Sequence, residues 1–161
     1  MERKWFSVTV SRMSDPEPAP APVSTLAELP FYLAARFDRP ALMRRCVGDG
    51  FESFSTREFV EQVRAVSVEL VRLGIGPGDR VGVICESRPE WSIADLAILT
   101  AGAINVPVYP TLSASQTEFI LRDAGVKAVF VSDDTQLAKL KEIAPGVPGL
   151  AAAVVVAPGG G

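Results

Sequence analysis

The sequence predicts an α/β fold, in which a mostly parallel sheet is flanked by helices and preceded by a β-hairpin. Three observations support this prediction. Helical apolar periods alternate with short apolar strands, four capping patterns precede helical periods, and glycine–proline turns separate segments. The expected strands are almost continuously apolar, which is typical of parallel strands buried under helices on both faces.

The composition indicates a globular protein with a sizeable core. The chain has 161 residues, of which 48% are hydrophobic and 22% charged. A compact chain of this length buries roughly 70% of its unfolded surface. The net charge of −3 gives no electrostatic footprint for a nucleic-acid partner. The chain has no histidine, which excludes a Ser-His-Asp triad, a Cys-His pair, an HExxH zinc site and a C2H2 finger within it.

Residues 1–24 are expected to form a disordered, proline-rich tail, and residues 25–161 the domain. Residues 15–22 read DPEPAPAP and should be extended polyproline-like chain. Only Ser14 separates Met13 from this stretch, and translation from Met13 is a hypothesis that N-terminal sequencing of the native protein would test. No apolar run reaches the ~18 residues of a membrane span, and the short apolar run at 5–10 is unlike a signal peptide.

The first expected helix starts at Thr25, where Thr25 and Glu28 fit the S/T-x-x-E capping box. Pro30 lies inside this helix and should kink or restart it, because an interior proline costs about 3 kcal/mol. A β-hairpin should follow, since residues 41–46 and 51–55 flank the turn sequence Gly48-Asp49-Gly50.

The clearest helix spans residues 56–73. Ser55 and Glu58 fit a capping box, and Gly74 should end the helix as a left-handed cap. Residues 76–79, Gly-Pro-Gly-Asp, then predict a tight turn. The apolar side chains recur at spacings of four and three, at Phe59, Val63, Val66, Leu70 and Leu73.

The remainder of the chain alternates between strand and helix. Pro89 should lie in the first turn of a helix, where its missing amide costs little. Ser87 with Glu90 and Ser115 with Glu118 complete the four capping boxes. The expected strands are 80–85, 105–109, 127–131 and 151–156, and the expected helices are 88–103, 116–123 and a last one from Asp133 or Asp134 through Ile143.

Gly74, Gly76 and Gly78 resemble the spacing of a nucleotide-binding loop. Such a loop leaves a strand and opens a helix, so that amides at the helix start meet phosphate. Here the order is helix, glycines, strand, which favours a plain turn.

Several polar residues lie near the expected strand ends. No two carboxylates pair as acid and base, and capping explains the last two of the series Glu86, Asp95, Asp123, Asp133 and Asp134. Thr111, Ser113 and Ser115 follow a strand end, where α/β sheets place ligands. No base, lysine or glycine loop stands beside these hydroxyls, so capping is favoured for them as well.

Two cysteines and one tryptophan have structural interpretations. Cys46 and Cys85 each lie in an apolar, strand-like run, which favours reduced, packed thiols in a cytosolic protein. Trp91 begins an apolar helix and is expected in the core. Residue chemistry alone thus predicts a parallel α/β domain without a visible catalytic set.

Longer residue strings resemble the N-terminal region of AMP-forming acyl-CoA synthetases, in the adenylate-forming superfamily. The resemblance covers about residues 25–156, with order and spacing intact. Its Tyr109-Pro-Thr and Arg88-Pro-Glu-Trp strings are most similar to the long-chain fatty acid–CoA ligase branch. The matching strings are Phe54-Ser-Thr-Arg-Glu-Phe59, Leu73-Gly-Ile-Gly-Pro-Gly-Asp-Arg-Val81, Arg88-Pro-Glu-Trp91, Ala94-Asp-Leu-Ala97 and Ala101-Gly-Ala-Ile-Asn-Val-Pro-Val-Tyr-Pro-Thr111.

The resemblance implies the Rossmann-like half of an adenylate-forming N-terminal domain and a two-step ligase reaction. ATP and a fatty acid would give an acyl-adenylate and pyrophosphate, and coenzyme A would then take the acyl group. In that family Mg²⁺, a Ser/Thr/Gly-rich loop and a lysine hold the phosphates. The implied location is cytoplasmic, with peripheral membrane contact left open.

The family's phosphate loop, nucleotide contacts and C-terminal lysine have no counterpart before Gly161, so the resemblance carries over no catalytic, cofactor-binding or metal residue. The chain is expected to be an inactive N-terminal fragment, without ATP–pyrophosphate exchange, poorly soluble, and binding neither ATP, Mg²⁺ nor coenzyme A well. Its expected partner is the C-terminal remainder of the enzyme. Two alternatives stay open: a non-catalytic α/β module that binds a ligand or partner, and a complete small nucleotide-binding protein.

Overall fold

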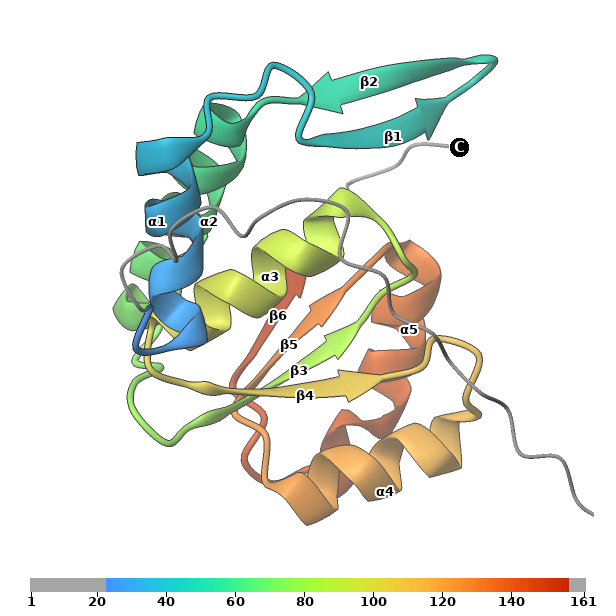
Figure 1. Cartoon of the computed structure of the whole chain (residues 1–161). Coiled ribbons are helices and arrows are strands. Elements are labelled where there is room, and N and C mark those ends of the chain that lie inside the picture. The colour runs from blue at the N-terminus through green and yellow to red at the C-terminus, as the bar shows by residue number, and fades with distance from the viewer. Residues whose placement is uncertain (1–22, 157–161) are drawn as a thin grey trace, which may run out of the picture.

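A computed structural model describes residues 23–156. The Met13 hypothesis and nearly all of the expected tail lie outside the described residues. The described chain forms a four-stranded parallel sheet between two helical layers, with a separate two-stranded antiparallel hairpin beside it (Figure 1). This architecture confirms the predicted fold class.

The elements follow the predicted order. The helices are α1 (Leu29–Arg36), α2 (Thr56–Arg72), α3 (Pro89–Thr100), α4 (Ala114–Ala124) and α5 (Asp134–Ile143), with 3-10 turns at Leu26–Glu28 and Ala144–Gly146. The strands are β1 (Met43–Val47), β2 (Gly50–Phe54), β3 (Arg80–Ile84), β4 (Ile104–Val108), β5 (Ala128–Val131) and β6 (Ala152–Val155). The parallel strands lie in the order β4-β3-β5-β6.

Each face of the sheet has its own apolar core. On one face, Val81, Val83 and Phe130 pack under α3, and α2 packs on α3 from outside (Figure 1). On the other face, Ile84 and Val129 pack with residues of α4 and α5. The central strands are therefore buried on both sides, as their continuous apolar sequence predicts.

Helix α2 shows the predicted cap at each end. The Ser55 hydroxyl accepts from the Glu58 N–H and the Glu58 carboxylate accepts from the Ser55 N–H, which confirms the capping box. Gly74 has a φ of 80°, and the N–H groups of Gly74 and Ile75 donate to Val71 and Leu70, which closes the helix as a Schellman motif. Leu73 is an exception to the predicted apolar face, because it is the C-cap and is exposed.

The other three predicted capping boxes are wrong. The Thr25 side chain caps nothing, and a 3-10 turn precedes α1; Pro30 lies in the first turn of α1, so the predicted restart is confirmed. The N-cap of α3 is Arg88, not Ser87. Helix α4 begins two residues earlier than predicted, with Ser113 as its cap.

The misplaced boxes have local causes. The overlapping sequence Ser-Ala-Ser-Gln-Thr-Glu offers two registers at α4, and the structure uses the box of Ser113 with Gln116. At α3 the carboxylate of Glu90 is bound by Arg45 and Arg88 and closes no capping box with Ser87. This helix also ends three residues early, because Gly102 at φ 79° closes it.

The hairpin has the predicted turn. Its strands pair in a regular antiparallel register from Met43 opposite Phe54 to Val47 opposite Gly50. The connection is the two-residue Gly48-Asp49, and Gly48 has a φ of 55°. In Figure 1 the hairpin projects past the start of α3 and away from the sheet.

Candidate functional site at the carboxyl edge of the sheet

Strands β3, β4 and β5 end at the same edge of the parallel sheet, at Ile84, Val108 and Val131. Ligands of open α/β sheets bind outside this edge, so its loops form the candidate site. The loops are residues 85–88, 109–113 and 132–133.

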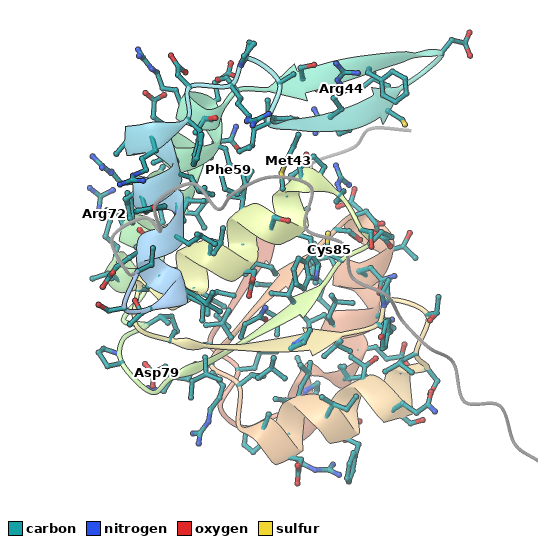
Figure 2. The ribbon with its side chains drawn as sticks, viewed as in Figure 1. Met43, Arg44, Phe59, Arg72, Asp79 and Cys85 are labelled. Atoms are coloured by element: carbon teal, nitrogen blue, oxygen red, sulfur yellow. The ribbon has the colours of Figure 1, made fainter. Side chains whose placement is uncertain are left out.

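Cys85 is the first residue after β3, and its side chain lies below the hairpin near the start of α3 (Figure 2). Burial raises the pKa of this thiol to about 11, and the charge of Glu86 acts in the same direction. A thiol with this pKa stays protonated at neutral pH and is a poor nucleophile. The prediction of a packed, reduced thiol is confirmed for Cys85.

For Cys46 the prediction of a packed thiol is wrong. Its side chain is a free, exposed thiol on the hairpin. It shares a face with its cross-strand partner Phe51, which is itself 69% exposed. No layer of the described fold covers that face, which is why an apolar strand sequence did not mean burial here.

A charged group of three side chains joins the end of β3 to the hairpin. The Glu90 carboxylate accepts from Arg88 Nε at 2.9 Å and is also paired with Arg45 of β1. Burial favours the neutral form of Glu90, but the Arg88 hydrogen bond and the positive charges of both arginines lower its pKa below the usual value overall. We call Arg45, Glu90 and Arg88 the Glu90 junction.

At the end of β5, Asp133 caps α5 as predicted. Its carboxylate accepts from the Gln136 N–H at 2.9 Å and from the Ser132 hydroxyl at 3.1 Å. The Gln136 hydrogen bond is the main cause of its lowered pKa. Asp134 follows in the first turn of the helix and is exposed.

At the end of β4, α5 holds the loop that carries Tyr109. Lys139 Nζ donates to the carbonyls of Pro110 at 2.9 Å and Leu112 at 3.1 Å, and Gln136 Nε2 donates to Pro110 at 3.3 Å. The sequence reasoning missed Lys139. Its only sequence signal is the three-residue spacing from Gln136, which places both side chains on one helix face.

The remaining predicted residues have structural positions. Ser113 caps α4, the Ser115 hydroxyl lies 3.1 Å from that of Ser113, and Thr111 is exposed. Asp95 accepts a hydrogen bond from the Asn105 amide at 2.7 Å. Three further side chains complete the set: Glu86 and Asp123 are exposed, and Trp91 packs half-buried against the core as predicted.

The glycine segment lies at the opposite, amino edge of the sheet, where Figure 2 shows Asp79 far from Cys85. The N–H of Gly76 donates to the Asp79 carboxylate at 3.0 Å, and the N–H of Gly78 donates to the Gly102 carbonyl at 3.2 Å. Lys127 pairs with Asp79 at 2.6 Å. These amides are engaged within the fold, which supports the predicted turn over a phosphate loop.

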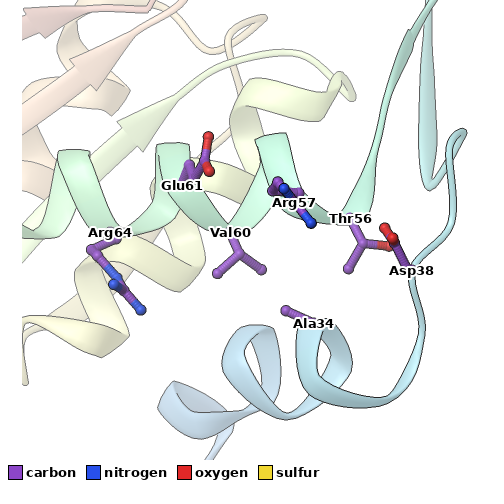
Figure 3. Close-up of a pocket in the computed structure, with 7 residues that line it drawn as sticks. All are labelled: Ala34, Asp38, Thr56, Arg57, Val60, Glu61 and Arg64. Atoms are coloured by element: carbon purple, nitrogen blue, oxygen red, sulfur yellow. The ribbon is translucent and has the colours of Figure 1, made fainter.

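A pocket of about 300 Å³ lies between α1 and α2 (Figure 3). Its charged side chains are of both signs and are exposed. The lining residues are Ala34, Asp38, Thr56, Arg57, Val60, Glu61 and Arg64.

The described residues are not arranged to bind a nucleoside triphosphate or its metal ion. Within residues 23–156 no group of three or more acidic or cysteine side chains is placed to hold a metal ion. Lys139 is bound to two carbonyls, and the glycine amides are engaged at the other edge.

Within residues 23–156, no helix is both long and apolar enough to cross a bilayer.

The parallel unit and its hairpin match the N-terminal fold of adenylate-forming enzymes, and the sequence comparison shows the family. The chain belongs to the AMP-binding enzymes, whose family model matches residues 33–159. It is similar to the long-chain-fatty-acid–CoA ligase FadD15 of Mycobacterium tuberculosis, with 33% identity over 119 residues. That match covers 74% of this chain and 20% of FadD15, so the chain spans about a fifth of this relative.

Two further similarities are to a solved structure and to a second protein of Mycobacterium tuberculosis. The crystal structure of a long-chain-fatty-acid-CoA ligase, FadD1, from Archaeoglobus fulgidus superposes with a TM-score of 0.70 at 21% identity, covering 81% of this chain and 27% of that one, and shows a shared fold. The uncharacterized protein Rv1549 of Mycobacterium tuberculosis is 32% identical over 111 residues, which are 65% of this chain and 63% of Rv1549.

Proposed function

We propose that this chain supplies the N-terminal scaffold of a long-chain fatty acid–CoA ligase. The complete enzyme would convert ATP, a fatty acid and coenzyme A into acyl-CoA, AMP and pyrophosphate, with Mg²⁺ as the metal. The observation that carries the proposal is the match to FadD15, which is 33% identical over 119 residues of a chain that belongs to the AMP-binding family.

The role of the chain in that enzyme is structural. Four polar side chains at the carboxyl edge have partners within the fold: Ser113 and Asp133 cap helices, Lys139 holds a loop and Glu90 binds two arginines. The fatty acid, ATP, Mg²⁺ and coenzyme A would therefore meet catalytic groups supplied by the remainder of the ligase, the partner of this scaffold.

The chemistry of the cysteines supports a reducing location. Both thiols are free, and Cys46 is exposed, which is typical of the cytoplasm. A lipid substrate would bring the complete enzyme to the periphery of a membrane.

A chimera tests the scaffold role. Residues 33–156 replace the matching segment of FadD15, and acyl-CoA formation and fatty-acid-dependent ATP–pyrophosphate exchange are measured beside unaltered FadD15. We expect activity within about tenfold of the parent, because the grafted part holds no reacting group. A second chimera carrying Lys139→Met shows whether the Tyr109 loop must be held in place. A folded first chimera without activity would contradict the proposal.

The chain alone gives the complementary test. We expect no exchange above a no-enzyme control from the purified 161-residue protein. Clear exchange would show that the chain itself holds a catalytic set.

The match to Rv1549 favours a second candidate. The match covers 63% of that protein, so this scaffold also makes up most of a short chain. A non-catalytic α/β module that binds a ligand or partner is therefore the alternative. A sharp, cooperative unfolding transition of monomeric protein would favour the module, and poor solubility would favour a scaffold that needs the rest of a ligase. Measurable binding of ATP by the isolated chain would instead favour a small nucleotide-binding protein.

A further inference from the structure

The hairpin is held to the domain by few contacts. Its outer face carries Arg44, Cys46, Phe51 and Ser53, all exposed. On its inner face only Phe54 is buried, at the base, with Met43 half-buried beside it. An isolated two-stranded hairpin is marginally stable in water, so its position depends on what fixes the inner face.

Arg45 makes the contact that lies farthest from the base. Within residues 23–156, no hairpin side chain nearer the turn has a hydrogen bond or ion pair to another element. Val47, the next inward-facing residue, is 55% exposed. The pairing of Arg45 with Glu90 is thus the outermost connection between hairpin and domain.

Glu90 is well placed to hold this connection. Its side chain is 10% exposed, and Arg88 binds both of its oxygens, at 2.9 and 3.3 Å, from the same end of α3. Pro89 lies between them in the first turn of the helix. Arg88 therefore fixes the Glu90 carboxylate on the domain independently of its contact with Arg45 from the hairpin.

We propose that Glu90 is a positioning residue that holds the β1–β2 hairpin against the start of α3, and that loss of its negative charge releases the hairpin while the parallel sheet stays folded. This assigns a role to the Arg88-Pro-Glu-Trp91 string: Trp91 packs half-buried against the core, and Glu90, fixed by Arg88, holds the hairpin. The proposal does not depend on the ligase function.

Hydrogen–deuterium exchange of the complete chain tests it. In Glu90→Gln, which keeps the shape and removes the charge, amides of residues 43–54 should exchange at least about tenfold faster, and those of β3 and β5 within about twofold of wild type.

The chain offers a matched control. Arg45 also pairs with Glu52, its cross-strand neighbour inside the hairpin. Glu52→Gln removes the same kind of charge from the same arginine without touching the domain. We expect it to change hairpin exchange by less than about threefold.

A second variant keeps the test independent of any folding defect in Glu90→Gln. Arg45→Met should release the hairpin as well, and the double variant should exchange no faster than the faster single one, because both variants remove the Arg45–Glu90 pair. Arg45→Met also removes the Arg45–Glu52 pair, for which Glu52→Gln is the control. The proposal is overturned if Glu90→Gln behaves like Glu52→Gln, if the hairpin and sheet lose protection together, or if the wild-type hairpin is already unprotected.

Discussion

The parallel sheet and the hairpin are both built from strands of four or five residues but are stabilised in different ways. Val83 in the centre of β3 is fully buried, whereas Val47 in β1 is 55% exposed. The sheet draws its stability from apolar contacts on two faces. The hairpin is stabilised by its own strand pairing, by Phe54 at its base and by the Glu90 junction. Strand formation and burial are therefore separate properties in this molecule.

The largest expected effect contrasts one substitution in both regions. Val83→Asp puts an unpaired charge into the core and should destabilise the domain by more than about 4 kcal/mol, enough to unfold it. Val47→Asp makes the same change on the hairpin and should shift the free energy of unfolding by about 0.5 kcal/mol or less. Urea denaturation followed by circular dichroism measures both. A comparable loss of unfolding free energy in both variants would show that the hairpin and the sheet are not stabilised differently.

Truncation of a helix over the sheet should have the next largest effect. Leu121 of α4 is fully buried against the sheet, so Leu121→Ala should cost about 2–5 kcal/mol. Phe119 on the same helix is exposed and gives the control, with an expected change below about 0.5 kcal/mol for Phe119→Ala. Thermal unfolding of the two variants checks the prediction, and a small effect at Leu121 would mean that α4 packs only loosely.

A glycine in the sheet should tolerate no side chain without adjustment of its neighbours. A Cβ on Gly82 would lie 3.0 Å from Leu121 Cδ2 and 3.1 Å from Val129 Cγ2. Gly82→Ala should therefore cost about 1–3 kcal/mol. Adding Leu121→Val should recover part of this loss, because the shorter side chain makes room. Chemical denaturation of the three variants tests the coupling, which strict additivity would contradict.

The smallest effect concerns the dependence of stability on pH. The pKa of Glu90 is lowered in the folded chain from an ordinary 4.5, so its contribution is present above that ordinary value and is lost as pH falls through the folded pKa. The facing charges are those of Arg45, Arg88 and, through Arg45, Glu52. Wild type should lose more stability than Glu90→Gln between about pH 5 and 3. Parallel acid-denaturation curves would show that Glu90 contributes nothing specific.

The alternation of elements was predictable because apolar periods and glycine or proline boundaries are local signals. The predicted strands differ from the observed ones by one or two residues at most ends, and the helix caps at Ser55, Gly74 and Asp133 were all found. At α4 the capping prediction failed because two local patterns are equivalent. Nothing in the sequence alone favours Ser113 over Ser115, since both precede a suitable partner by three residues.

Two polar contacts at the sheet edge could not be predicted, because they join residues far apart in the chain. Glu90 pairs with Arg45, which is 45 positions away in the sequence, and Lys139 donates to the carbonyl of Pro110, which is 29 positions away. Only the folded topology brings these partners together. For the same reason Cys46 was expected to be packed: its apolar neighbours are local, but the layer that would bury it has to come from elsewhere.

Each of the two regions contains one cysteine, and the two thiols differ sharply. Cys46 lies open on the hairpin, while Cys85 is buried at the end of β3 and has a pKa of about 11. A thiol-specific reagent should therefore modify the folded chain once, quickly, and the unfolded chain twice. The rate of the second modification, at Cys85, measures how often the sheet opens. A spectroscopic label attached to Cys46 reports on the motion of the hairpin alone.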